Sequence, residues 1–417
     1  MSETVVVGGG LAGLVAAGRL ADAGHKVTLY EERDEVGGRV RSRDVEGFTC
    51  DRGFQVLFDA YPAVRRELDL DALDLRPFAP GGVICRQGKR AVLSDPLREP
   101  FSAIESAFNR EVSLGDKLRT LLLRARLTRG EWPEFGIPDR SIRAYLRDKG
   151  FSSGFIDAFA APLYGGITLD RSLSPSAHVF EYTFRAMALG NIVVPAEGMG
   201  AIPAQLAQRA REAGVDVRTG EGVEYIDAQD DSATVEAGGE TVEPDAVVVA
   251  TDPRTARELT GVEAIPVEGK GVVTQYCRLP GPELSAGTRI MLNAETEGPN
   301  TVAQLSAVAP EYASGDDVLL AASYVGEYAQ SLEAEGLETR TRATLAGWYP
   351  ERGFEDLETL ATDRVPFAQF AQPPGSHETL PDTGDPPGPV YLAGDYTRWS
   401  SIQGALESGK RAAEAVE

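Results

Sequence analysis

The feature that most constrains this chain is a glycine-rich turn placed between a short apolar strand and an apolar helix. We expect strands at Thr4–Val7 and Val27–Tyr30, with a helix at Leu11–Ala23 between them. This order predicts a βαβ unit, and a βαβ unit requires a parallel sheet with right-handed crossovers.

The turn itself has the pattern G-x-G-x-x-G, formed by Gly8, Gly10 and Gly13. The first glycine permits a tight turn, the second lets a pyrophosphate approach the backbone, and the third lets the helix pack closely. We therefore expect a dinucleotide site at the helix N-terminus, including the first-turn residues Leu11 and Ala12.

Glu31 ends the second expected strand, about 20 residues beyond the glycine turn. A carboxylate at this point accepts hydrogen bonds from ribose hydroxyls and disfavours a 2′-phosphate, so we do not expect NADP here. No second G-x-G-x-x-G precedes a helix, and a separate NAD(P)H domain is therefore not expected.

The segment after Glu31 reads ERDEVGGRVRS. Its two glycines and an arginine would set exposed amides and a cation beside the same pyrophosphate. From Val5 to Arg41 the chain resembles the flavin amine oxidase and phytoene desaturase superfamily. That resemblance implies FAD rather than NAD, with cofactor contacts from Glu32, Arg33, Gly38 and Arg39.

The C-terminal segment Tyr391–Ala413 is similar to the closing FAD motif of plant and cyanobacterial carotene desaturases, above all in the run AGDYT. By this resemblance Asp395 bonds the ribityl or pyrophosphate part of FAD. The backbone at Gly404 and Ala405 would face the N1 and O2 edge of the isoalloxazine ring. A helix N-terminus suits that edge because reduced flavin carries negative charge there.

Three weaker matches fit the same family pattern. Val223 occupies the place of a valine whose backbone bonds adenine in relatives, and Gly53 lies in a loop that passes close to the flavin in relatives. Pro195–Gly200 (PAEGMG) resembles a P-x-G-G-M stretch, with Glu197 in place of the first glycine. Each segment could instead be an ordinary strand or turn with no part in cofactor binding.

These observations together predict an α/β fold with a Rossmann-type FAD-binding domain and a second lobe of antiparallel sheet plus helices. We assign residues 1–60, 191–265 and 388–417 to the FAD-binding domain. Residues 61–190, which have a helical pattern, and residues 266–387 form the expected substrate-binding lobe. In the latter we expect strands at Val272–Arg278, Thr301–Ala309 and Val318–Tyr324.

The resemblance also bears on the reaction. Amine oxidases of the superfamily place an aromatic pair and a lysine near the flavin, and here those positions fall near Ser401 and Val272, with Trp399 and Lys270 close by. No acid–base catalytic residue can be assigned. Our leading hypothesis is an FAD-dependent oxidoreductase that accepts a hydride from a hydrophobic, isoprenoid or carotenoid-like substrate. The alternatives are an amine or protoporphyrinogen oxidase, and a non-catalytic flavin-binding structural or assembly protein.

The charge balance of the chain limits the classes of molecule that it is expected to bind. The chain has 417 residues, with 64 acidic against 41 basic side chains and a net charge of −23, so binding to nucleic acid is not expected. Only six of the basic residues are lysines. A salt-rich cytoplasm or a GC-rich genome would each account for this composition.

No signal peptide or bilayer-spanning apolar run is recognisable, which predicts a cytoplasmic protein. Cys50, Cys85 and Cys277 are scattered, as are the three histidines, so neither disulfides nor a metal site is expected. No cysteine follows Cys277, and a flavin held non-covalently is therefore the expectation. The oligomeric state is open.

One segment breaks the acidic character of the chain. Lys117–Arg129 carries five cations and no acid. An apolar stripe runs along it, formed by Leu114, Leu118, Leu121, Leu122 and Ala125. A basic amphipathic helix can lie peripherally on an anionic membrane. The alternative is a helix of the second lobe whose stripe lies in the core and whose arginines pair with neighbouring acids. For Phe180 and Phe184, one turn apart, core packing is favoured over a substrate wall.

Overall fold

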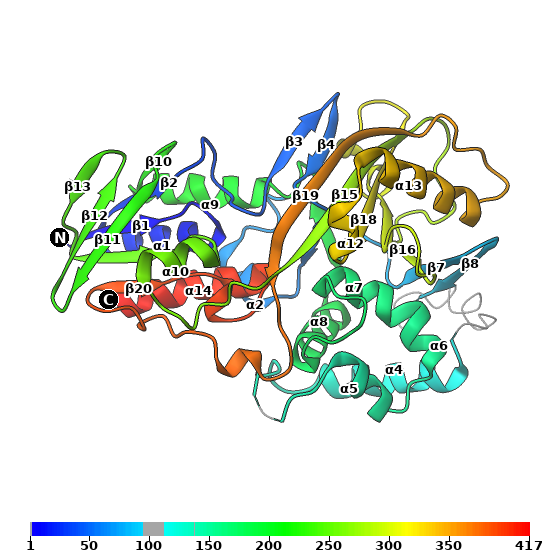
Figure 1. The fold of residues 1–417 in the computed structure, drawn as a ribbon, viewed down its shortest axis with the longest axis horizontal. Helices are drawn as coiled ribbons and strands as arrows, with labels where there is room; N and C mark the ends of the chain where they lie inside the picture. Colours follow the sequence, from blue (N-terminus) through cyan, green and yellow to red (C-terminus); the bar gives the residue numbers. More distant parts are fainter. Residues whose placement is uncertain (1, 95–111, 137) are drawn as a thin grey trace.

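A five-stranded parallel sheet forms one end of the molecule in the computed structural model, which describes residues 2–94, 112–136 and 138–417 (Figure 1). Its strand order is β10-β2-β1-β14-β20. The strands are Asp216–Thr219, Lys26–Glu31, Glu3–Val7, Ala246–Val249 and Val390–Leu392. Every neighbouring pair is parallel, which confirms the sheet predicted from the opening βαβ unit.

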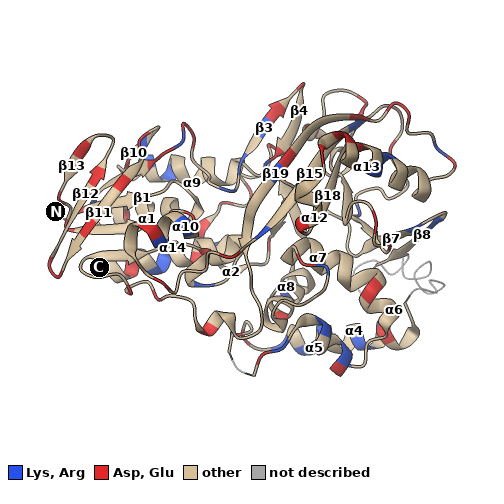
Figure 2. Ribbon diagram, in the orientation of Figure 1, with Lys and Arg blue, Asp and Glu red and all other residues tan. Residues whose placement is uncertain are grey.

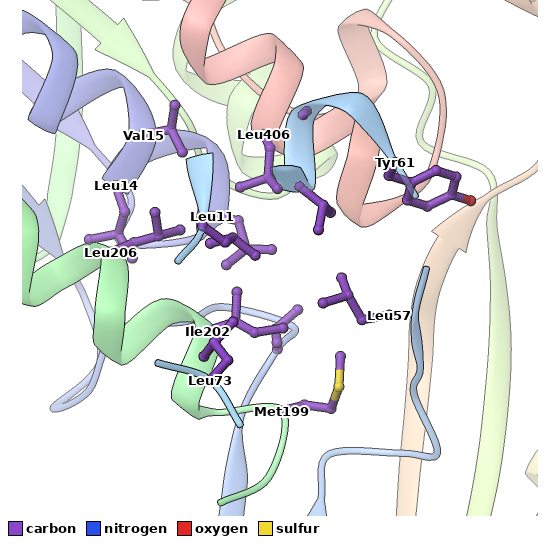
Figure 3. Packing of buried hydrophobic residues seen from close by; sticks show 14 of the residues in the cluster. Leu11, Leu14, Val15, Leu57, Tyr61, Leu73, Met199, Ile202, Leu206 and Leu406 are labelled. Carbon is purple, nitrogen blue, oxygen red and sulfur yellow. The ribbon is translucent and has the colours of Figure 1, made fainter. Parts of the chain in front are cut away.

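Three helices pack together beside this sheet, namely α1 (Leu11–Asp22), α9 (Ala201–Glu212) and α14 (Ile402–Val416). Helix α1 contains almost only Leu, Val, Ala and Gly and is buried along most of its length. Gly409 allows α14 to approach closely, because a Cβ there would lie 2.3 Å from the Ala12 carbonyl oxygen. Figure 3 shows side chains of all three helices pointing into one apolar core.

A seven-stranded sheet forms the opposite end, in the order β19-β15-β18-β17-β16-β7-β8. Its strands are Glu358–Phe370, Gly269–Leu279, Val318–Val325, Thr301–Gln304, Met291–Asn293, Gly82–Arg86 and Lys89–Leu93. All its pairs are antiparallel except β16 with β7. Helix α13 (Ala334–Trp348) contributes Leu337, Leu345 and Trp348 to a second apolar core that this sheet shares.

Helices occupy the space beneath this sheet in Figure 1. They are α4 (Leu114–Leu127), α5 (Ile142–Asp148), α6 (Ser153–Phe155) with a π-helical turn at Ile156–Ala160, α7 (Ala161–Thr168) and α8 (Ala177–Leu189). Phe180 is 3% exposed in their shared core, and its ring lies 5.6 Å from that of Phe184. The core-packing interpretation of this pair is therefore the one that the structure favours.

Smaller sheets accompany the two large ones. A hairpin pairs β3 (Ser42–Val45) with β4 (Phe48–Asp51), and β9 (Ile192–Pro195) lies between β5 (Leu57–Phe58) and β6 (Leu75–Pro77). A separate antiparallel sheet contains β11 (Val223–Gln229), β12 (Ser232–Ala237) and β13 (Glu240–Val242). Helix α2 (Pro62–Glu67) contacts α14, α10 (Pro253–Thr260) contacts β11, and α12 (Glu327–Ser331) contacts β15 and β18.

Two expectations were wrong in detail. Residues 61–190 are not wholly helical, because they contain β6 and the β7–β8 hairpin, whose partner strands come from distant parts of the chain. The expected strand at Thr301–Ala309 ends at Gln304 and continues as a short helix, Leu305–Val308. The Ser306 hydroxyl accepts the Leu319 amide there and so replaces a bond of the strand ladder.

Acidic side chains occur on most elements of the molecule (Figure 2). Within residues 2–94, 112–136 and 138–417, no helix combines the length and apolar character needed to cross a bilayer. The same residues contain no group of three or more His, Cys, Asp or Glu side chains placed to hold a metal ion.

Candidate functional site

The glycine turn lies at the carboxyl end of β1, where the central strand of the parallel sheet leads into α1. Gly8 has φ +105°, a conformation that favours glycine. A Cβ on Gly13 would lie 2.0 Å from the Gly8 carbonyl oxygen, so only glycine fits there. A Cβ on Gly10, by contrast, would have no heavy atom within 4 Å. The middle glycine thus faces open space.

That open space lies at the N-terminus of a helix without a capping side chain. Gly10 is the N-cap, and no side chain accepts a hydrogen bond from the first turn. The first amides of a helix, here those of Leu11 and Ala12, have no carbonyl partner within the helix and carry partial positive charge. The arrangement is suited to an anion such as a pyrophosphate.

Glu31 lies beside this turn at the end of β2 and is only 4% exposed. Its Oε2 accepts the Gly9 amide at 2.7 Å, and its Oε1 accepts the Arg33 amide at 3.1 Å. Each oxygen of a carboxylate has two acceptor positions, so hydroxyl donors can still be accommodated. Glu32 behaves differently, because its exposed carboxylate lies 3.4 Å from the Arg33 guanidinium.

Val223 begins β11 close to this corner of the site. The Glu221 amide donates to the Glu31 carbonyl, and a Cβ on Gly222 would lie 3.4 Å from Cβ of Glu32. The structure therefore brings Val223 to the end of β2, beside Glu31 and Glu32.

The two glycines before Arg39 pack closely against the glycine turn. Gly37 donates its amide to the Gly9 carbonyl at 2.8 Å, and a Cβ on Gly38 would lie 3.4 Å from Cα of Gly10. Both glycines have positive φ. Arg39 is consequently held at the edge of the same open space.

Arg39 also joins the start of the chain to its end. Its Nη2 donates to Oδ1 of Asp395 at 2.6 Å, and its Nη1 donates to the Ala368 carbonyl. Burial opposes the charge of the guanidinium, but the Asp395 carboxylate outweighs this effect and raises the pKa of Arg39. Asp395 is almost fully buried and also accepts the Ser400 hydroxyl.

The closing motif runs from Asp395 into α14. A Cβ on Gly404 would lie 2.0 Å from the Trp399 carbonyl oxygen, so the chain turns tightly here. The Gly404 amide donates to the Ser401 hydroxyl and the Ala405 amide to the Ser401 carbonyl. These two amides are thus already engaged within the turn, which sequence reasoning did not anticipate.

Gly53 lies beside strands β15 and β19 of the seven-stranded sheet, with φ +81°. The atoms nearest to a Cβ placed there belong to Val272, Val365 and Thr274, at 3.7 to 3.9 Å. Val272 and Val365 form an apolar cluster with Leu169. The position that family resemblance reserves for a lysine is therefore part of an apolar wall beside Gly53.

The two residues that an alignment shift would have brought in are engaged elsewhere. Lys270 lies 3.4 Å from the Asp170 carboxylate in an ion pair. Trp399 is 5% exposed and packs among Tyr61, Phe135 and Tyr182, with ring centroids 5.1 to 6.0 Å apart. Ser401 is the N-cap of α14.

Sequence reasoning missed one buried polar group, the carboxyl of Asp51. Asp51 is buried and accepts the Ser42 hydroxyl at 2.5 Å and the Met199 amide at 2.9 Å, with the Tyr312 hydroxyl at 3.4 Å. Burial raises the pKa of Asp51 to about 6. The carboxyl thus links the hairpin before Gly53 to the Pro195–Gly200 turn, whose Glu197 points to solvent. Its only sequence signal was its place two residues before Gly53.

Comparison with known proteins bears directly on this arrangement. The family described as flavin containing amine oxidoreductase matches residues 11–417. Phytoene dehydrogenase of Streptomyces griseus is 29% identical over 289 residues, which cover 63% of this chain and 56% of that protein. The chain thus spans about half the length of that curated relative.

Two further comparisons extend over nearly the whole chain. A probable zeta-carotene desaturase of Synechococcus elongatus is 25% identical over 475 aligned residues, covering 99% of this chain and 98% of that protein. The structure of putrescine oxidase with putrescine superimposes with a TM-score of 0.74 at 20% identity, covering 100% of this chain and 98% of that one. The shared architecture confirms the predicted α/β fold with a parallel sheet and additional antiparallel sheets.

Proposed function

The chain belongs to the flavin containing amine oxidoreductase family, and from that premise we propose that it is an FAD-dependent enzyme acting on a hydrophobic, isoprenoid or carotenoid-like substrate. Members of this family are oxidoreductases, so a purely structural flavin-binding role is set aside. When bound, the flavin supplies the hydride acceptor at its N5 position. The protein has to bind, orient and enclose the two reactants.

We assign the cofactor to the space around Gly10. The amides of Leu11 and Ala12 and the guanidinium of Arg39 would neutralise the pyrophosphate, and Glu31 would accept ribose hydroxyls. Glu32, Arg33, Gly38 and Val223 border the adenosine and diphosphate end, whereas Gly53, Asp395, Gly404 and Ala405 border the flavin end. Since the Gly404 and Ala405 amides are engaged within the turn, their proposed role is close packing against the ring.

The proposed division of labour follows the two large sheets. Residues 1–60, 191–265 and 388–417 would hold FAD, and residues 61–190 and 266–387 would hold the substrate. In support, all five strands of the parallel sheet come from the first group of residues. All seven strands of the other large sheet come from the second group.

A non-covalent flavin is favoured by the state of the thiols. Cys50, Cys85 and Cys277 are buried. Burial raises the pKa of Cys50 and of Cys277 to about 12, and it raises the pKa of Cys85 as well. The reactive thiolate is therefore scarce at neutral pH.

One observation carries the substrate proposal, namely the apolar wall beside Gly53. Val272 occupies the expected lysine position and packs with Val365 and Leu169. Such a wall can align a hydrocarbon C–H bond and exclude water, but it offers no base for an amine. The related phytoene dehydrogenase and zeta-carotene desaturase bear the names of carotenoid substrates, which supports the same class.

An amine or protoporphyrinogen oxidase remains the second candidate because Lys270 lies on the same strand, two residues from Val272. Its ion pair with Asp170 holds it at the border of the apolar cluster, since Leu169 precedes Asp170. A rearrangement of that pair would be needed before Lys270 could approach Gly53.

The decisive experiment is anaerobic bleaching of the bound flavin. We expect loss of the flavin absorbance with phytoene or a related carotenoid precursor in detergent micelles, and none with putrescine. Bleaching by putrescine or by a protoporphyrinogen, with no response to any carotenoid precursor, would overturn the substrate proposal. Protein that stays colourless after incubation with FAD would overturn the cofactor proposal as well.

A further inference from the structure

Helix α4 presents a row of leucines to solvent. Leu114, Leu118 and Leu122, spaced one turn apart, are 75%, 59% and 62% exposed. Leu189, which is 45% exposed, is close by, because the Arg124 guanidinium donates to the carbonyl of the preceding residue, Ala188. Of the six large apolar side chains exposed in the described part of the chain, four thus gather here. The interpretation that the whole apolar stripe lies in the core was wrong for three of its leucines.

The opposite side of α4 holds the helix in place without these leucines. Leu123 and Leu127 are buried in the core of the helical region. Asp116 is also buried, forms a capping box with Ser113 and accepts the amide and hydroxyl of Ser152. The exposed leucines are therefore not required for folding.

The charge around this row is opposite to that of the molecule. Between Ser113 and Gly130 the only acid is the buried Asp116, which lies 3.9 Å from Arg119, and from outside the helix Glu181 of α8 pairs with Arg126 at 3.6 Å. Five cations flank the leucines, namely Lys117, Arg119, Arg124, Arg126 and Arg129, on a chain whose net charge is −23. Figure 2 shows acidic side chains on most of the other elements. The combination of leucines and cations is typical of a helix that lies in a membrane interface.

We propose that α4 docks the protein on an anionic lipid bilayer, with Leu114, Leu118 and Leu122 among the acyl chains and the cations at the phosphate groups. Charge complementarity selects this occupant. The long side chains of Arg126 and Arg129 can reach headgroups from a helix lying in the interface plane.

A second copy of the chain fits the surface less well. Two α4 helices facing each other would bring their cations together. Elsewhere on the described surface the exposed large apolar side chains are Tyr225 of β11 and Tyr328 of α12, which belong to separate elements and offer no matching patch. The bilayer satisfies both the leucines and the charges.

Helix α8 connects this surface to the proposed site. The Arg185 guanidinium donates to the carbonyls of Leu127 and Arg129, which fixes α4 against α8. On the same helix, the Tyr182 ring lies 5.1 Å from that of Trp399 in the closing motif. Docking through α4 would therefore set the helical region against a membrane in which a hydrophobic substrate dissolves.

The test is flotation of the flavin-loaded full-length protein with lipid vesicles. We expect binding to phosphatidylcholine vesicles that contain about one quarter phosphatidylglycerol, and weak binding to phosphatidylcholine alone. The double variant L118Q/L122Q should bind roughly tenfold less. The matched control Y225Q/Y328Q, which removes the two other exposed apolar side chains, should bind as the parent does. Circular dichroism should show the same melting temperature for all three proteins.

Charge is tested separately. R126Q/R129Q should lower binding to the anionic vesicles only, and KCl at about 1 M should do the same because the screening length falls to about 3 Å. Equal flotation of the parent and L118Q/L122Q would overturn the proposal. So would a concentration-dependent dimer that L118Q/L122Q abolishes in the absence of vesicle binding, since the leucines would then cover a second copy. Vesicle binding needs no turnover, so this result is independent of the proposed reaction.

Discussion

The glycine turn and the wall beside Gly53, the two parts of the proposed site, are built in opposite ways. In the turn, two positions have requirements that only glycine satisfies, namely the positive φ of Gly8 and the 2.0 Å approach at Gly13. In the wall, Val272, Val365 and Leu169 come from distant segments and share only their apolar character. Binding a phosphate requires particular backbone positions, whereas enclosing a hydrocarbon requires only volume and shape.

The largest effect should come from the third glycine of the turn. In Gly13→Ala the new methyl would lie 2.0 Å from the Gly8 carbonyl oxygen. We therefore expect the melting temperature to fall and FAD binding to be lost. Gly10→Ala should separate the two properties. Its methyl meets no protein atom within 4 Å but fills the space proposed for the pyrophosphate.

We therefore expect Gly10→Ala to keep the melting temperature of the apoprotein while FAD affinity falls on the order of 100-fold, or about 2.7 kcal/mol. Titration calorimetry and thermal melts measure the two quantities. Gly18→Ala, on the same helix with its nearest contact at 3.9 Å, is the control. Unchanged FAD affinity in Gly10→Ala would show that the ligand binds elsewhere.

The free energy of unfolding should depend on pH through the buried carboxyl of Asp51. Burial raises the pKa of this carboxyl to about 6, from 3.8 as the ordinary value. Between these values the folded protein retains a proton that the unfolded chain has lost. The free energy of unfolding should therefore fall as pH rises from about 4 to 6, by about 3 kcal/mol from this group alone.

Asp51→Asn should remove that part of the pH dependence, and urea unfolding at several pH values measures it. Asp44→Asn, an exposed carboxylate on the same hairpin, is the control. A parent and Asp51→Asn whose stabilities change in parallel between pH 4 and 6 would contradict the raised pKa.

A smaller effect is expected from the ion pair that joins the ends of the chain. Arg39→Ala leaves the Asp395 carboxylate buried with the Ser400 hydroxyl as a remaining donor. Because about a third of the Arg39 side chain is exposed, we expect a loss of about 2 kcal/mol in stability rather than the full cost of breaking a buried pair. FAD affinity should fall with it.

A double-mutant cycle with Asp395→Asn tests this coupling. Arg43→Ala, which breaks the more exposed pair with Asp363, should cost well under 1 kcal/mol. Strictly additive effects of the Arg39 and Asp395 substitutions would indicate that the pair contributes nothing to stability.

The smallest effect should come from the wall. Val272→Ala should change kcat/KM for a hydrophobic substrate by about tenfold and leave FAD affinity unchanged. Val273→Ala is the matched control, because Val273 is fully buried in the other core on the opposite face of the same strand. If Val272→Ala weakens FAD binding as much as it changes turnover, the proposed division between the glycine turn, which binds FAD, and the apolar wall, which binds substrate, is wrong.

The amino-acid sequence by itself determined the parallel sheet, the glycine turn and the start of α1. These features have local causes: a strand pattern, positions where only glycine fits, and a carboxylate at a fixed distance along the chain. The motifs at Gly8–Gly13 and Tyr391–Ala413 were therefore recognisable without coordinates.

Only the tertiary structure decided which side chains from distant segments meet and which remain in solvent. The Arg39–Asp395 pair spans 356 positions of the sequence, and the buried Asp51 is bonded by Ser42 of its own hairpin and by Met199 and Tyr312 from two distant segments. Whether Leu118 is buried was equally undetermined, since a helical stripe fixes which leucines share a face but not what packs against them. Such contacts depend on long-range packing, which no local pattern of residues encodes.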